Sequence, residues 1–154
     1  MNEISCYLGK TLLLMAKVLL LHEQDENILF VCDSSSSSKI FCEKMKQFCA
    51  TLKNKSCYIE IHSINLLQSD RDGKARFKSL IESRPNYNLV IDELAMESFY
   101  YVSHETRKLQ ERKKKVVCVI RPEETAVELS ELSYNSYGFQ IIHLTSNMRN
   151  TGRI

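Results

Sequence analysis

Short apolar runs recur along the chain and alternate with longer segments of helical periodicity. The runs occupy residues 28–32, 57–62, 89–91, 116–120 and 139–144. Most of them are apolar at every position, which is typical of strands buried on both faces of a parallel sheet. Alternation of such strands with helices predicts an α/β fold with a three-layer, mainly parallel sheet. We expect a single domain over residues 1–154.

The segments between the apolar runs predict helices. Residues 10–22 are rich in Leu, Met and Ala and contain neither Gly nor Pro, so we expect a helix that starts after Gly9. In residues 40–52 the apolar side chains recur at helical spacing with charged residues between them, which predicts an amphipathic helix. Further helices are expected around residues 77–81, ending near Pro85, and from about Met96 to Lys114.

Composition limits the partners and the cellular compartment that we expect for this chain. The net charge of +2 gives no general attraction to nucleic acid or acidic membranes, so any basic site must be local. The apolar stretch of residues 12–21 is shorter than the roughly 20 residues that span a bilayer, and it lacks the flanks of a signal peptide. The 6 Cys include no Cys-x-x-Cys pair. We therefore expect reduced thiols, no membrane segment and an intracellular protein, cytoplasmic or nuclear.

Gly9-Lys10-Thr11 stands immediately before the first predicted helix. Gly-Lys-Thr closes the phosphate loop G-x-x-x-x-G-K-[ST], in which backbone amides and the Lys hold phosphates while the Thr binds magnesium. That pattern places an earlier glycine where this chain has Ile4, and no long β run comes before it. The tripeptide therefore has two interpretations, the end of a nucleotide-binding loop or a helix that starts after a glycine.

Asp92-Glu93 directly follows the apolar run of residues 89–91. A phosphate-loop ATPase places such a pair at the end of a buried strand, where the Asp helps to hold magnesium and the Glu orients or deprotonates the attacking water. A solvated strand terminus is the alternative explanation. Because the tripeptide and the acid pair occur in the expected order, together they favour a nucleotide site more than either does alone.

Leu144 to Arg149 follows the last predicted strand and reads Leu-Thr-Ser-Asn-Met-Arg. With this segment the chain resembles the first RecA-like domain of superfamily 1 helicases, of the UvrD-like and Schlafen-like kind, in which a strand is followed by L-x-x-N-[YM]-R. The resemblance spans nearly the whole chain. It implies a P-loop NTPase domain that lacks its first strand and is truncated at both ends, with a second RecA-like domain in the full-length relative.

The resemblance implies that the chain binds ATP and Mg²⁺. Gly9, Lys10 and Thr11 would then end the Walker A motif, with Lys10 on the phosphates and Thr11 on magnesium. Asp92 would be the second magnesium ligand, in the Walker B position. The expected partners are therefore a nucleotide and its metal ion.

The resemblance also implies the catalytic residues of an ATP hydrolase. Glu93 would activate the attacking water, and Arg149 would approach the γ phosphate, where a planar guanidinium can meet two phosphate oxygens at once. The family's G-D-x-x-Q-like segment, which couples nucleotide state to nucleic acid, is replaced by Arg-Pro-Glu-Glu at residues 121–124. We expect a fragment of a helicase-like ATPase without this polar sensor.

Two stretches are candidates for contact with single-stranded nucleic acid. Ser34 to Lys39 lies in the region of the family's motif Ia, and hydroxyls with a Lys can bind phosphate oxygens without reading sequence. The alternative is a flexible serine loop that caps the next helix. The second stretch, Arg107 to Lys115, is mostly basic, and its alternative is the solvated face and C-terminal end of a helix.

Two functions without ATP hydrolysis stand beside the ATPase hypothesis. The first is an inactive interaction or regulatory module that keeps only the fold, and Ile4 in place of a glycine favours it. The second is a nucleic-acid-binding module that uses Ser34 to Lys39 and the basic stretch without any nucleotide.

Overall fold

The computed structural model describes residues 2–34, 39–52, 56–67 and 70–120 of the chain. Its elements are α1 (Asn2–Glu23), β1 (Ile28–Asp33), α2 (Lys39–Ala50), β2 (Ile59–Ile64), α3 (Arg71–Ser83), β3 (Asn88–Leu94), the short 3-10 helix η1 (Met96–Ser98), α4 (Phe99–Glu105), α5 (Arg107–Glu111) and β4 (Val116–Ile120). The predicted strand at residues 139–144 and the segment with Arg149 lie outside the described residues.

The four strands form one sheet in the order β2-β1-β3-β4, and every neighbouring pair is parallel. Ile28 aligns with Ile59 on one side and with Asn88 on the other, so β1 is a central strand. All residues of β1 and β3 are buried, as their uninterrupted apolar runs predict. The prediction of an α/β fold with a parallel sheet is confirmed over the described residues.

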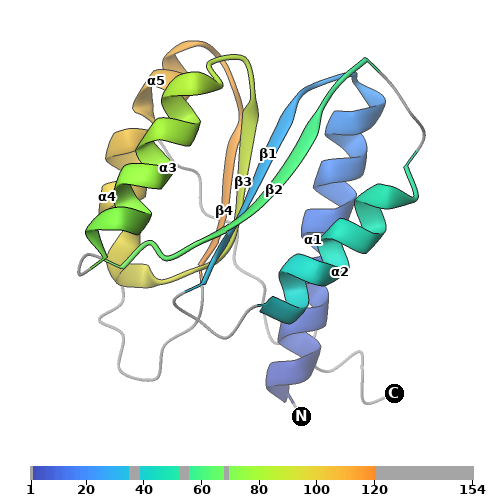
Figure 1. Cartoon of the computed structure of the whole chain (residues 1–154). Helices are drawn as coiled ribbons and strands as arrows, with labels where there is room; N and C mark the ends of the chain where they lie inside the picture. The colour runs from blue at the N-terminus through green and yellow to red at the C-terminus, as the bar shows by residue number, and fades with distance from the viewer. Residues whose placement is uncertain (1, 35–38, 53–55, 68–69, 121–154) are drawn as a thin grey trace.

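Helices cover both faces of the sheet, which gives three layers (Figure 1). Helices α1 and α2 lie on one face, and α3, α4 and α5 lie on the other. Alternate residues of β1 serve the two layers: Leu29 and Val31 pack with α3, α4 and α5, whereas Phe30 and Cys32 pack with α1 and α2. The sheet therefore shares its strands between two separate apolar cores.

The first helix differs from its prediction. α1 starts at Asn2, so the expected start after Gly9 was wrong. A glycine inside a helix costs only about 1 kcal/mol relative to alanine, and apolar residues packed along the rest of a long helix can offset that cost. Gly9 therefore interrupts the sequence pattern without ending the helix.

The predicted long helix from Met96 to Lys114 is divided into η1, α4 and α5. The division between α4 and α5 falls at Thr106, whose hydroxyl donates to the Ser103 carbonyl at 3.4 Å. Such a side-chain bond to the preceding turn competes with helical backbone bonds and disfavours a continuous helix. The expectation of a single helix here was wrong.

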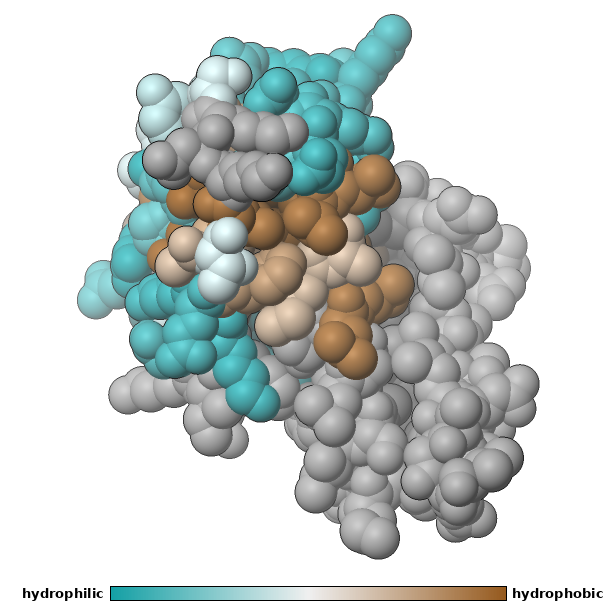
Figure 2. Space-filling view, turned by 90° about the vertical axis from the view of Figure 1, so that its right-hand side faces the viewer, coloured by the Kyte–Doolittle hydropathy of each residue, from teal (hydrophilic) through white to brown (hydrophobic). Residues whose placement is uncertain are grey.

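The outer face of α1 is unusually apolar. The leucines at positions 12, 13, 19 and 20 are each between 40% and 62% exposed. Figure 2, which views the molecule from the side of α1 and α2, shows an apolar band among hydrophilic residues. No helix within the described residues is both long and apolar enough to span a membrane.

Candidate functional site

The carboxyl ends of β1 and β3 lie side by side at the centre of the sheet. From β1 the chain proceeds to β2 on one side, and from β3 it proceeds to β4 on the other. Ligands of open α/β sheets bind at such a switch point, because the connecting loops diverge there and leave a crevice beyond the strand ends. Three acidic residues stand at these two strand ends, Asp33, Asp92 and Glu93.

Asp33 ends β1 and is fully buried. Its carboxylate accepts a hydrogen bond from the Leu66 amide at 3.3 Å and another from the Ala95 amide at 3.1 Å. Leu66 follows β2, and Ala95 follows β3. One carboxylate thus fixes the backbone that leaves each of the two neighbouring strands.

Asp92 and Glu93 are only 2% and 3% exposed. The Glu93 amide donates to Asp92 Oδ1 at 2.9 Å, and the pairing of β3 with β4 slips between Ile91 and Leu94. Glu93 has φ 56°, in the left-handed region that costs a non-glycine residue about 1 kcal/mol or more. The alternative of a solvated strand terminus therefore does not describe this pair, which sits in a buried bulge.

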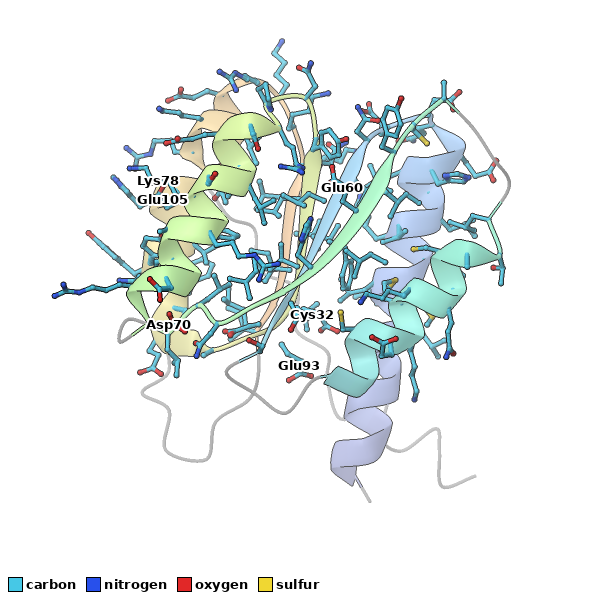
Figure 3. The ribbon with its side chains drawn as sticks, viewed as in Figure 1. Cys32, Glu60, Asp70, Lys78, Glu93 and Glu105 are labelled. Atoms are coloured by element: carbon cyan, nitrogen blue, oxygen red, sulfur yellow. The ribbon has the colours of Figure 1, made fainter. Side chains whose placement is uncertain are left out.

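Cys32 pairs in register with Asp92 and adds a buried thiol to this end of the sheet. Burial raises the pKa of the Cys32 thiol, and the nearby Cys42 thiol and the Asp92 carboxylate raise it further. Figure 3 shows Cys32 and Glu93 at the carboxyl end of the sheet, on the side of α2. The structure gives free thiols at Cys32, Cys42, Cys49, Cys57 and Cys118.

The structure places Gly9-Lys10-Thr11 within α1 rather than in a loop. The N-terminal half of this helix lies beside and beyond the carboxyl ends of the strands, the end of the sheet where the acid pair stands (Figure 1). Amides beyond the first turn of a helix donate to carbonyls of the same helix. In this conformation the amides of the tripeptide do not form a cradle for phosphate.

The remaining predicted site residues are described only in part. Ser34 donates its amide to the Ile64 carbonyl at 2.9 Å, and Lys39 begins α2, but residues 35–38 lie outside the described chain. Arg149 and residues 121–124 lie outside it as well. The structure therefore brings the tripeptide and the acid pair to one end of the sheet without describing Arg149.

The basic stretch Arg107 to Lys115 covers α5 and the turn that leads to β4. Most of its cations are exposed, and Lys114 Nζ lies 3.5 Å from Glu26 Oε2. This arrangement agrees with the solvated helix face that was the alternative for this stretch.

The prediction of a magnesium site gains no support, because no group of three His, Cys, Asp or Glu among the described residues could hold a metal ion.

Sequence reasoning missed the role of Asp33 as a link between strand ends. The signal was present, since Asp33 closes the apolar run of residues 28–32 just as Asp92 closes residues 89–91. The role of Asp33 depends on the strand order, which places β1 beside β3 although β2 lies between them in the sequence. Local patterns do not carry that order.

Comparisons of the chain with protein-family models, with curated proteins and with solved structures gave no match.

Proposed function

We propose that this chain is an ATP-binding domain of the RecA-like, superfamily 1 helicase type. The observation that carries the proposal is the buried pair Asp92-Glu93 at the carboxyl end of a central strand, at the switch point of a parallel sheet. Buried carboxylates are costly unless something compensates their charge, so their gathering at the usual ligand-binding end favours a functional role.

In the proposed site each residue has a separate task. Lys10 contacts the phosphates, since a lysine side chain can reach an anion from a helix without help from backbone amides. Thr11 and Asp92 would hold the magnesium ion. Glu93 activates the attacking water and Arg149 stabilises charge on the transferred group. Magnesium would supply charge neutralisation at the phosphates.

A titration with a fluorescent ATP analogue tests this proposal. With Mg²⁺ present, the chain should bind the analogue saturably, and Lys10→Ala should weaken binding about tenfold or more. Asp92→Asn should reduce the dependence on Mg²⁺. Lys46→Ala is the matched control, because Lys46 is exposed on α2 and pairs with Glu43 on the surface. Identical curves for Lys10→Ala and the control would contradict the proposal.

A second candidate function is an interaction module that keeps the fold and binds no nucleotide. The observation in its favour is the helical backbone at Gly9-Lys10-Thr11, which withholds the amides that phosphate binding uses. Phosphoryl transfer is fast only in a preorganised electrostatic site. Without those amides, hydrolysis of ATP would be slow even in a chain that bound the nucleotide. The same titration separates the two candidates, since a chain without any saturable binding fits only the module.

Coupling to nucleic acid forms part of the main proposal. We expect the stretch from Ser34 to Lys39, which connects β1 to α2 in the sequence, to contact a single-stranded backbone. Binding to single strands should then weaken as salt rises and should change when ATP and Mg²⁺ are added. Binding that depends on salt alone would instead support a nucleic-acid module without ATP.

A further inference from the structure

A thiol and an imidazole are in contact at the amino end of the sheet, opposite the acid pair. Cys57 Sγ lies 3.4 Å from His22 Nδ1, within hydrogen-bonding distance for sulfur. His22 stands in the last turn of α1 and is only 4% exposed, while Cys57 precedes β2 and is half-buried. A nucleophile within hydrogen-bond reach of a base is the arrangement that activates thiols.

The backbone around Cys57 is held in place. The amide of the next residue, Tyr58, donates to Asn27 Oδ1 at 2.9 Å, and the Tyr58 carbonyl accepts from the Ile28 amide at 2.9 Å. These bonds join the start of β2 to the turn that follows α1. The backbone that directly follows Cys57 is therefore anchored to the turn after α1.

The other described cysteines stand in different surroundings. Burial raises the pKa of Cys49 to about 11 and that of Cys118 to about 12. Cys32 and Cys42 are almost completely buried in the core of α1 and α2. A raised pKa keeps the thiols of Cys49 and Cys118 protonated, and burial shields those of Cys32 and Cys42 from reagents. Among the described residues, Cys57 alone combines partial exposure with an imidazole at hydrogen-bonding distance.

We propose that Cys57 is an oxidative modification site for small hydroperoxides, with His22 as its base. His22 Nδ1 takes the thiol proton, and the thiolate sulfur attacks one oxygen of hydrogen peroxide. A sulfur–oxygen bond forms and the oxygen–oxygen bond breaks, so sulfur loses two electrons to the leaving oxygen. That oxygen takes the proton from the imidazolium and departs as water, which leaves a sulfenic acid on Cys57.

Acidic residues follow His22 in the chain. Of these, Glu23 and Asp25 are exposed. Glu26 is bonded to Asn88 and lies near Lys114.

Trapping of the sulfenic acid tests the proposal on the intact chain. The protein is treated with hydrogen peroxide and dimedone, and each cysteine is quantified by mass spectrometry. Cys57 should be labelled about tenfold faster than Cys49, which serves as the reference in the same molecule. His22→Asn should remove most of that advantage. His104→Asn, which changes an exposed histidine on α4, should leave it unchanged.

A second cysteine, the fully buried Cys32, reports whether the His22→Asn variant folds. If His22→Asn unfolds, the buried Cys32 becomes labelled. The labelling rates of Cys57 and Cys49 are then compared in the wild-type chain with and without urea. The advantage of Cys57 over Cys49 should then vanish in urea. An advantage that persists in urea, an equal rate for the two cysteines in the native chain, or an unaltered rate in folded His22→Asn would overturn the proposal.

Discussion

At the amino end of the sheet, the neutral amide side chain of Asn88 links neighbouring strands through hydrogen bonds. At the carboxyl end, the carboxylate of Asp33 links them. Asn88 donates to the Asn27 carbonyl at 3.1 Å and accepts from the Lys115 amide at 2.9 Å. Asp33 accepts from two backbone amides at the other end. Neutral amides are thus sufficient to link the strands at the amino end, whereas the carboxyl end depends on a buried carboxylate. The two ends should therefore respond differently to the loss of the side chain that links them.

The largest expected effect is that of Asp33→Asn. The change keeps the size of the side chain but turns one acceptor into a donor that faces a backbone N–H. We expect a loss of about 3 kcal/mol in the free energy of unfolding, measured in urea, because two bonds to a buried carboxylate are disturbed. Glu111→Gln, at an exposed position, should change it by less than about 0.5 kcal/mol. A small loss at Asp33 would show that a neutral side chain serves equally well at this end.

Gly73→Ala should have the next largest effect. A Cβ at this position would overlap the carbonyl oxygen of Asn65, which precedes Leu66, the residue whose amide Asp33 holds. The loop or α3 must therefore shift, at a cost of about 2 kcal/mol. Thermal unfolding would measure the change. Ser79→Ala, on the exposed face of α3, is the control and should be close to neutral.

Asn88→Ala tests the amino end. It removes three hydrogen bonds of a buried amide, yet it leaves no charge uncompensated, so the expected loss is between about 1 and 2 kcal/mol. Urea unfolding measures it beside Asn86→Ala, which alters an exposed position of the preceding turn. A loss larger than that of Asp33→Asn would reverse the ranking of the two ends.

The smallest effect is expected for Glu60→Gln, at a strand position between the two ends. Arg84 donates two hydrogen bonds of 2.7 Å to Glu60 and, with help from His62, lowers the pKa of Glu60 to about 2. The pKa of Glu60 in the folded chain lies below its ordinary value of 4.5. The stabilisation that ionised Glu60 gives to the folded state is therefore fully present above about pH 4.5 and disappears as pH falls through about 2.

The pair is partly open to solvent, so its contribution should stay below about 1 kcal/mol. The difference in melting temperature between the wild type and Glu60→Gln should therefore be constant above pH 5 and shrink toward zero near pH 2. Glu43→Gln, in an exposed pair with Lys46, should show no such trend. A difference that grows as pH falls would contradict the direction of the pKa shift.

The sheet was the most predictable part of the molecule. Strands β1, β3 and β4 contain the predicted apolar runs, and β1 and β3 are buried on both faces, where most positions need apolar side chains. The start of α1 was not predictable from Gly9, since the cost of one glycine is small beside the packing of Leu14, Val18 and Leu21 along the same helix. Thr106 divides a segment whose overall composition favours a helix.

The candidate site was predictable only as a set of residues. Asp92 and Glu93 follow an apolar run and were identified from that position, but their burial and the bulge at Glu93 depend on long-range packing. Contact between His22 and Cys57 joins residues 35 positions apart, and no local pattern connects them. Such contacts follow from the order of the strands, which the sequence states only indirectly.

The pairing of β1 with β3 has a consequence for how the chain reaches this structure. Asn27 and Asn88 meet although 61 positions separate them, and α2, β2 and α3 lie between. Closing so long a loop costs conformational entropy before the central contacts repay it, so folding of the sheet should be slow for its size. The two halves of the chain each contribute one central strand. A break between β2 and α3 should therefore leave neither half able to form its own core.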